Sequence, residues 1–275
     1  RGVAVVVPHW DETKCIQCNQ CAYVCPHATI RPFAMTEDEA AAAPEATRTL
    51  DAMGPKAKGM KFTMAVSPLD CMGCTNCVKV CPKGALEMVP TEQEMDQQPV
   101  WDYMVENVSE KKELIAANVK GSQFKQPYLE FSGSCAGCAE TAYARLVTQV
   151  AGDRMFISNA TGCSSIWGNP AATAPYCKDK DGHGPAWNNS LFEDNAEHGL
   201  GNEAVQHKLI AATQDIIAAD GPSDELKAAG QAWIDCVNDA EASKTAAAAY
   251  VAELEKCGCE ASKAILADKA YLTKK

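Results

Sequence analysis

Short apolar segments, separated by polar stretches rich in Gly and Pro, make up the first part of the chain. Apolar residues recur at roughly helical spacing from 91 to 119, which predicts helix there. The stretch 36–61 is instead rich in Ala, Glu, Pro and Gly, which predicts an inserted surface excursion. We therefore expect a first domain over residues 1–118 that is interrupted by an insertion at about 31–65.

A different pattern begins after Pro127. Apolar runs at 128–131 and 155–158 predict two short strands, and the periodicity from 138 to 150 predicts a helix between them. Such a βαβ unit favours a parallel sheet in an α/β domain. Residues 162–200 are rich in Gly, Pro and Asn, and we expect a long ordered loop there.

The remaining residues, 202–274, have the spacing of three or four amphipathic helices. Ser223 is expected to cap one of them, with Asp224 and Glu225 in its first turn. These patterns predict a second domain over 119–275, which is an α/β segment with a parallel sheet and a helical C-terminal stretch.

Composition and charge exclude several classes of protein. The 275 residues carry a formal net charge of −11, which argues against a nucleic-acid partner. No apolar run is long enough to span a membrane. The 15 cysteines, tightly spaced and without a signal peptide, predict thiolates in a reducing cytoplasm. Both termini have the look of cuts through a longer polypeptide, and a processed chain is the alternative.

Two runs of cysteines share the spacing C-x2-C-x2-C-x3-C-P. They consist of Cys15, Cys18, Cys21, Cys25, Pro26 and of Cys71, Cys74, Cys77, Cys81, Pro82. In bacterial ferredoxins this spacing holds [4Fe–4S] clusters, and the fourth cysteine of each run ligates the other cluster. A pair of structural zinc knuckles is the alternative, and the matched gaps disfavour it. The repeat predicts an α+β, two-[4Fe–4S] ferredoxin-like domain that passes single electrons.

The spacing also predicts which cysteines share a cluster. Three cysteines three residues apart can wrap one face of a cluster, whereas the fourth ligand has to come from elsewhere. We expect one cluster at Cys15, Cys18, Cys21 and Cys81, and the other at Cys71, Cys74, Cys77 and Cys25.

A third constellation lies in the second domain. Cys135 and Cys138 form a C-x2-C pair, and from spacing alone a zinc half-site, a redox dithiol and a cluster remain open. The pair lies between a predicted strand and a predicted helix, at the sheet edge where α/β domains bind ligands. The start of that helix also suits an anion such as a pyrophosphate.

Three motifs, read with the double cysteine run, resemble the family of pyruvate:ferredoxin oxidoreductases (pyruvate synthases) in its homodimeric, single-polypeptide form. They are CAGCAET at 135–141, GCSSIWG at 162–168 and PAWNNSLFEDNAEHGLG at 185–201. The resemblance covers nearly the whole chain. It implies an interior piece of a longer enzyme, namely the ferredoxin-like domain and the first part of a thiamine-diphosphate domain.

The resemblance implies specific roles for residues in these motifs. Cys135, Cys138 and Cys163 become ligands of a third, proximal [4Fe–4S] cluster, whose fourth ligand lies outside the chain. Glu140 and Cys163 are implied to lie beside thiamine diphosphate, whose Mg²⁺ site is also outside the chain. The family usually has glycine where this chain has Ala139, so the local geometry is in question there.

The implied reaction is the oxidative decarboxylation of pyruvate to acetyl-CoA, with coenzyme A as co-substrate and thiamine diphosphate as the electron sink. Three [4Fe–4S] clusters then relay the electrons to ferredoxin or flavodoxin. The implied partners are the remainder of the polypeptide, a second copy of it and this acceptor, with no nucleic acid and no membrane. The chain by itself is expected to be an incomplete and inactive part.

Two other functions remain open from the sequence. One is a free-standing polyferredoxin, although a pure carrier has no need of the GCSSIWG and PAWNNSLFEDNAE motifs. The other is a related enzyme that acts on a different 2-oxoacid. The remaining cysteines, Cys177, Cys236, Cys257 and Cys259, are expected to be free thiols, with a redox or metal role as the alternative. Glu193, Asp194 and Glu197 are either a solvated helix start or an edge of the cofactor pocket.

Overall fold

The computed structural model describes residues 1–168 and 173–273. By contact density the chain forms two compact units. The first comprises Arg1–Gly152 and Ile166–Gly182, and the second comprises Asp153–Ser165 and the chain from His183 onward. The expected boundary between 118 and 119 therefore lies inside the first unit.

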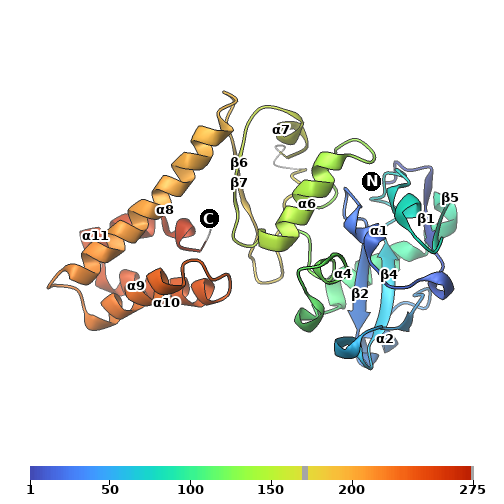
Figure 1. Cartoon of the computed structure of the whole chain (residues 1–275), viewed down its shortest axis with the longest axis horizontal. Coiled ribbons are helices and arrows are strands. Elements are labelled where there is room, and N and C mark those ends of the chain that lie inside the picture. The colour runs from blue at the N-terminus through green and yellow to red at the C-terminus, as the bar shows by residue number, and fades with distance from the viewer. Residues whose placement is uncertain (169–172, 274–275) are drawn as a thin grey trace. The chain divides into compact units, whose positions relative to one another are not determined.

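The first unit contains two small antiparallel sheets. Strands β1 (Val6–Trp10) and β5 (Leu86–Pro90) form one of them, with Val6 opposite Pro90 and Trp10 opposite Leu86. The other has the order β2-β4-β3, with strands β2 (Ile30–Met35), β4 (Lys61–Val66) and β3 (Leu50–Asp51). In Figure 1 β2 and β4 run side by side as the long hairpin of this unit.

Each cysteine run leads into a short helix. The helices of the first unit are α1 (Gln20–Tyr23), α2 (Glu37–Ala41), α3 (Asn76–Val80), α4 (Gln97–Asn107), α5 (Val119–Ser122) and α6 (Ala139–Ala151). Short 3₁₀ turns occur at Glu12–Lys14, Pro55–Ala57, Thr91–Glu94 and Lys112–Leu114. The order strand, cysteine run, helix and strand thus occurs twice, in keeping with the internal repeat.

The expected insertion is only partly an excursion. Its bounds at about 31–65 include most of β2 and β4, whose side chains are largely buried. Phe62 and Met64 of β4 pack with Trp10 in the core beside the cysteines. The residues between the two strands form α2 and β3, and β3 adds a third strand beside β4. The strands that bound this segment belong to the core because they carry the apolar side chains.

The predicted βαβ unit is only partly correct. The helix is present as α6, and the second strand is present as β6 (Phe156–Asn159). Residues 128–131 do not form a regular strand, because only Leu129 makes an isolated antiparallel bridge, to Tyr176. The parallel partner of β6 is β7 (Ala186–Asn189), which lies within the expected loop at 162–200.

That expected loop also contains helix α7 (Cys163–Gly168) and the start of α8. Its residues 169–172 lie outside the described residues. The fold is thus mixed, with a parallel pair of two strands where the sequence had suggested a larger parallel sheet.

The C-terminal stretch consists of the expected helices. They are α8 (Asn195–Ala218), α9 (Asp224–Cys236), α10 (Ala242–Cys257) and α11 (Glu260–Ala267), followed by a 3₁₀ turn at Lys269–Leu272. Figure 1 shows α9 and α10 lying side by side below α8. The Ser223 hydroxyl accepts a hydrogen bond from the Leu226 N–H, which confirms the predicted cap of α9.

The core of these helices is formed by the buried side chains of Leu209, Trp233, Tyr250 and Ile265, among others. Trp233 and Tyr250 stack, and the indole N–H of Trp233 donates to the Leu272 carbonyl at 2.8 Å. None of the described helices is both long and apolar enough to cross a bilayer.

Candidate metal centre

Four cysteines from the two separate runs line one cavity of the first unit. Cys15, Cys18 and Cys21 come from the first run, and Cys81 is the last cysteine of the second. The rest of the lining is mainly apolar and includes Trp10 and the side chains of Ile16, Met64, Pro82 and Leu86. This is the set that the spacing predicted for one cluster.

The other four cysteines also lie near one another. Cys25, Cys71 and Cys77 are buried, and Cys74 is half-buried. Burial raises the pKa of the Cys71 thiol to about 11, and nearby Cys25 and Cys74 act in the same direction. Burial likewise raises the pKa of Cys77, with further contributions from Cys25, Cys71 and Cys74.

These raised pKa values carry a chemical consequence. Several thiolates gathered in a buried, apolar site are unstable unless a cation compensates their charge. Metal coordination supplies that compensation, because a coordinating thiol is deprotonated by the metal. The gathering of eight buried or half-buried cysteines thus fits a multi-iron group better than eight free thiols.

The backbone around the cysteines repeats as well. In each run the residue two positions after the first cysteine donates its N–H to that cysteine's sulfur: Gln17 to Cys15 and Gly73 to Cys71, each at 3.4 Å. Ala85 donates in the same way to Cys81 at 3.2 Å. Such hydrogen bonds to sulfur are one of the levers by which a protein sets the potential of an iron–sulfur cluster.

Three left-handed positions recur at the same offsets in both copies. They are Gln17, Asn19 and Ala28 in the first copy and Gly73, Thr75 and Gly84 in the second, with φ between 54° and 67°. A non-glycine residue in this region costs about 1–2 kcal/mol. Both copies adopt this conformation although the first has no glycine at these positions. The path of the cysteine loop, and not the presence of glycine, therefore sets these φ angles.

The C-x2-C turn of Cys135 and Cys138 lies against the second cysteine run. Gly137, between the two cysteines, has φ 77°, and a Cβ built on it would lie 3.5 Å from the Cys74 Cβ. The two loops therefore lie close together within the first unit. Cys135 is exposed and Cys138 is half-buried at the N-cap of α6.

A buried chain of hydrogen bonds joins the end of the first cysteine run to the Cys138 turn. His27, two residues after Cys25, places its Nδ1 3.4 Å from the Ser132 hydroxyl. Ser132 contacts the Ser134 hydroxyl at 3.0 Å, and Ser134 contacts the Thr141 hydroxyl at 3.1 Å. The Thr141 hydroxyl in turn donates to the Cys138 carbonyl at 3.3 Å. The sequence analysis did not predict this chain of hydrogen bonds, because scattered serine and threonine residues follow no spacing rule.

Arg145 of α6 is a second feature without a sequence signal. Only 2% of its surface is exposed, and it donates to the Tyr23 carbonyl at 2.5 Å. Its other acceptors are the amide oxygens of Gln123 and Gln149, and in the described chain it has no carboxylate partner. Burial lowers its pKa to about 10, against which the nearby Cys25 acts. A buried cation therefore lies near Cys25, and its hydrogen bonds go to carbonyl and amide oxygens while its Nε has no acceptor among the described residues.

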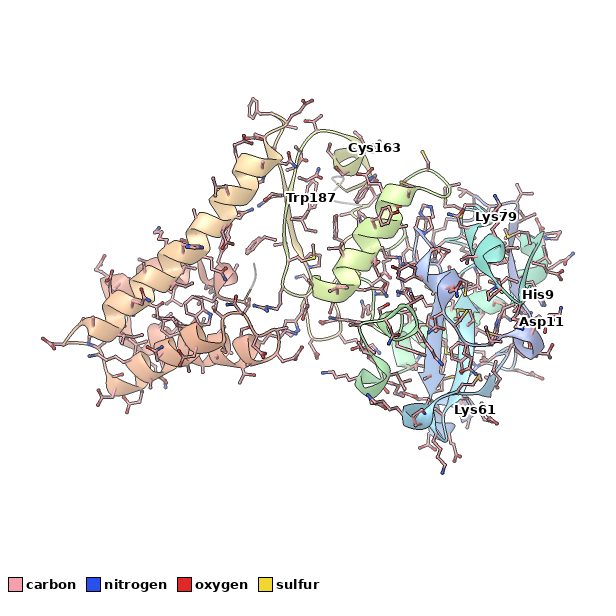
Figure 2. The ribbon with its side chains drawn as sticks, in the orientation of Figure 1. His9, Asp11, Lys61, Lys79, Cys163 and Trp187 are labelled. Atoms are coloured by element: carbon pink, nitrogen blue, oxygen red, sulfur yellow. The ribbon has the colours of Figure 1, made fainter. Side chains whose placement is uncertain are left out.

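The residues implied for thiamine diphosphate are divided between the two units. Glu140 is exposed in the first turn of α6. Cys163 is exposed at the first residue of α7 and belongs to the second unit (Figure 2). Its union with Cys135 and Cys138 therefore stays a prediction. Ala139 is the first helical residue of α6 and has no left-handed φ, so this position does not require glycine.

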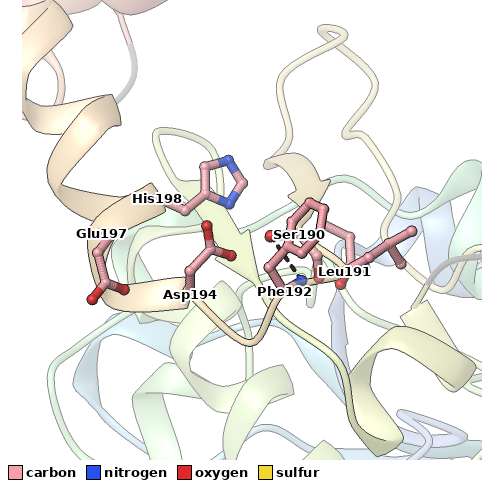
Figure 3. Close-up of a pocket in the computed structure, with 7 residues that line it drawn as sticks. Ser190, Leu191, Phe192, Asp194, Glu197 and His198 are labelled. Carbon is pink, nitrogen blue, oxygen red and sulfur yellow. Dashed lines mark hydrogen bonds between the residues drawn. The ribbon is translucent and has the colours of Figure 1, made fainter.

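The acidic segment before α8 lines an open pocket in the second unit (Figure 3). Asp194 and Glu197, both noted in the sequence, are joined there by Phe192 and His198. The Phe192 N–H donates to the Ser190 hydroxyl at 3.2 Å, which bends the chain into the pocket rim. His198 was missed because a single histidine on a helix carries no spacing signal.

Comparisons with known proteins agree with these observations. Residues 14–85 match the family described as the 4Fe–4S dicluster domain. Over 289 aligned residues the chain is 47% identical to the pyruvate:ferredoxin oxidoreductase of Moorella thermoacetica, covering 100% of this chain and 25% of that protein. It is 50% identical to the pyruvate-flavodoxin oxidoreductase of Klebsiella pneumoniae, over 85% of this chain and 20% of that protein.

A third relative differs in its acceptor. The mitochondrial pyruvate dehydrogenase [NADP(+)] of Euglena gracilis is 45% identical over 85% of this chain and 13% of its own length. The chain thus spans a quarter or less of the length of these relatives. It is similar along its whole length to one segment of the pyruvate:ferredoxin oxidoreductase and over 85% of its length to the pyruvate-flavodoxin oxidoreductase, and its residues 14–85 match the 4Fe–4S dicluster domain.

Proposed function

We propose that this chain is the electron-transfer and cofactor segment of a cytoplasmic pyruvate oxidoreductase that forms acetyl-CoA and delivers electrons to ferredoxin or flavodoxin. The cavity lined by Cys15, Cys18, Cys21 and Cys81 carries this proposal. Its donors come from two runs far apart in sequence, as a two-cluster ferredoxin requires. The similarity to pyruvate:ferredoxin and pyruvate-flavodoxin oxidoreductases supports the choice of substrate and acceptor.

In this proposal the protein supplies ligands, hydrogen bonds and a dry environment, whereas bound [4Fe–4S] clusters supply one-electron chemistry. Cys71, Cys74, Cys77 and Cys25 hold the second cluster. The proximal site comprises Cys135, Cys138 and Cys163, completed by a ligand outside the chain. Glu140 and Cys163 form part of the thiamine-diphosphate site, which also needs Mg²⁺ from elsewhere. A second copy of the enzyme and the rest of the polypeptide complete the catalytic assembly.

The closeness of Gly137 to Cys74 supports an order for the relay. The turn that carries Cys135 and Cys138 lies beside the loop of the second cluster. We therefore place the Cys71-Cys74-Cys77-Cys25 centre next to the proximal site, and the Cys15-Cys18-Cys21-Cys81 centre farther out. Electrons from pyruvate then reach the external acceptor through the latter.

Anaerobic reconstitution of the chain with iron and sulfide tests the metal centres. Two cubane clusters require about eight iron atoms and an equal amount of labile sulfide. An additional four irons would mean that the proximal site also assembles within the chain. Stoichiometric zinc at the cysteines, with no labile sulfide, would overturn the proposal.

The substrate is tested in the full-length enzyme. Pyruvate with coenzyme A is expected to reduce the clusters, as followed by electron paramagnetic resonance (EPR), and Cys135→Ser is expected to interrupt reduction of the two outer centres. A Cys236→Ser variant is the matched control, since Cys236 lies in α9 and outside every proposed ligand set. Clusters that dithionite reduces but pyruvate never does would support a plain electron carrier instead.

A further inference from the structure

Two exposed cysteines meet at the corner between α10 and α11. Cys257 is the last residue of α10, and Cys259 is the N-cap of α11. Gly258 between them has φ 60°, which turns the chain and brings the two side chains to the same side. The Cys257 thiol donates to the Cys259 sulfur, and the two Sγ atoms are 3.0 Å apart.

The environment of this pair differs from that of the cluster cysteines. Both thiols are exposed, and their neighbours Lys256, Glu260 and Lys263 are exposed as well. On the inner side, Ser262 is fully buried and its hydroxyl lies 3.3 Å from the Cys259 sulfur. Both thiols are thus accessible to small molecules from solvent. The first turn of α11 holds the Cys259 thiol in place on the inner side.

Electrostatics make Cys259 the better nucleophile of the two. It occupies the N-cap of α11, where the free N–H groups of the first turn favour a negative charge. The hydrogen bond from Cys257, followed by those from Ser262, lowers the pKa of the Cys259 thiol to about 7. A thiol with a pKa near ambient pH reacts fastest in thiol–disulfide exchange.

We propose that Cys257 and Cys259 form a redox-active dithiol that exchanges with low-molecular-weight disulfides and closes an intramolecular disulfide across the α10–α11 corner. The site is separate from the cysteines proposed for the clusters.

The exchange proceeds in two balanced steps. The Cys259 thiolate attacks one sulfur of the external disulfide, forming a mixed disulfide and releasing one external thiolate. The Cys257 thiolate, after loss of its proton to solvent, then attacks the Cys259 sulfur and expels the second external thiolate. The external disulfide gains two electrons, and the protein dithiol is oxidised by the same two.

The two helices that meet here are anchored by buried side chains. Leu254 of α10 and Ile265 of α11 are both in the core of the second unit. Closure of the disulfide would fix the turn between them without moving either anchor. We therefore expect oxidation to stiffen this corner and to leave the helices intact.

The sequence provides a convenient assay. Trypsin cleavage after Lys256 and Lys263 yields the peptide 257–263, which contains these two cysteines and no others. The peptide 228–244 contains only Cys236 and is an internal control. The whole chain is equilibrated anaerobically with glutathione buffers of rising oxidised fraction, quenched with acid, alkylated and digested.

We expect peptide 257–263 to change from the doubly alkylated form to an unalkylated disulfide form, which is two hydrogen atoms lighter than the free dithiol peptide. The Cys236 peptide should stay alkylated or gain a single glutathione in the same buffers. With Cys257→Ser, the reaction should stop at a glutathione adduct on Cys259, because the resolving thiol is gone. This readout does not depend on iron, so its failure is distinguishable from failure of the proposed function.

Two results would overturn the proposal. One is glutathione adducts on peptide 257–263 without the internal disulfide, which would mean that the cysteines react independently. The other is oxidation at the same buffer ratio as Cys236, which would mean that the pair has no special reactivity. A Cys259→Ser variant gives the second test, since it should make Cys257 alkylate more slowly at neutral pH than Cys259 does in Cys257→Ser.

Discussion

At the scale of residues, the last cysteine of each run lies with the first three cysteines of the other run. Cys25 and Cys81 follow their own runs in sequence, yet Cys81 lines the cavity of Cys15, Cys18 and Cys21. Cys25 lies beside Cys71 and Cys77. In the proposed assignment each run contributes one ligand to the other centre, so separation of the two halves of the repeat would cost both clusters.

This crossing gives the first prediction. Cys81→Ser should halve the iron content and leave Cys15, Cys18 and Cys21 open to alkylation, although they lie in the other run. The cysteines at 71, 74 and 77 should stay protected. Cys25→Ser is the matched variant and should give the opposite pattern. Peptide mapping after alkylation of the reconstituted chain distinguishes them, and exposure of the mutated run itself would refute the crossed assignment.

Arg145 leads to the second prediction. Because it is buried beside Tyr23 and Cys25, its charge should stabilise the additional electron of the reduced second cluster. Arg145→Met should lower the midpoint potential of that cluster by on the order of 50 mV, since 59 mV is a tenfold change in a one-electron equilibrium. An EPR-monitored redox titration measures the shift.

The control for this prediction is Arg145→Lys, which keeps the charge and should restore most of the potential. An equal shift in both clusters would point to a general loosening of the first unit. An upward shift, or no shift in Arg145→Met, would contradict the electrostatic role.

At the scale of elements, the two cysteine loops are more similar in backbone conformation than in sequence. Gly73 and Gly84 occupy left-handed positions that Gln17 and Ala28 occupy in the other copy. The two glycines differ in their surroundings, because a Cβ on Gly73 would lie 3.0 Å from the Val6 carbonyl oxygen, whereas a Cβ on Gly84 would meet nothing within 4 Å.

The third prediction follows from that difference. Gly84→Ala should reduce the free energy of unfolding by about 1 kcal/mol, which is the cost of a left-handed alanine. Gly73→Ala should cost more, because β1 also has to move away from the new methyl group. Denaturant unfolding of the two iron-loaded variants under anaerobic conditions gives the order, and the reverse order would contradict the structural account.

Elements also show what the sequence was able to predict. The Ser223 cap and the helices after it were predictable, because caps and helical periodicity are local signals. The strand predicted at 128–131 was wrong, because Tyr128 and Leu129 are buried without a ladder and only Leu129 forms a bridge. The partner of β6 lies about thirty residues away in a Gly- and Asn-rich stretch. Its apolar–polar alternation covers too few residues to predict a strand.

The candidate site likewise contains residues that the sequence predicts and residues that it does not. The eight cysteines and their crossed grouping followed from spacing, since ligand geometry imposes it. Arg145 and the hydroxyls of Ser132 and Ser134 were invisible, because they act through tertiary neighbours that no local pattern encodes.

At the scale of the whole molecule, several of the proposed metal ligands belong to the described core of the first unit and none to that of the second. Cys25 and Cys77 are part of the core that contains Trp10 and Phe62. The core of the second unit, around Trp233 and Tyr250, contains none of the proposed ligands. Iron should therefore stabilise the first unit by binding to its folded form, and leave the second unaffected.

The fourth prediction tests this separation. Removal of iron with an anaerobic chelator should speed amide hydrogen exchange in β1, β5 and the helices α1 and α3. Exchange in α8 to α11 should stay within error of the iron-loaded chain. Mass-spectrometric exchange resolves the two regions, and an equal rise in both would mean that the units fold as one.

The hydroxyl chain from His27 to Cys138 has a consequence for the movement of charge. The hydrogens of Ser132, Ser134 and Thr141 can rotate, so each oxygen can exchange the roles of donor and acceptor. The local dipoles can then follow a passing electron while the heavy atoms stay in place. Because each rotation is itself a reorganisation, these hydroxyls add a polar contribution to the reorganisation energy of a charge transfer beside them, while both charge states share one backbone.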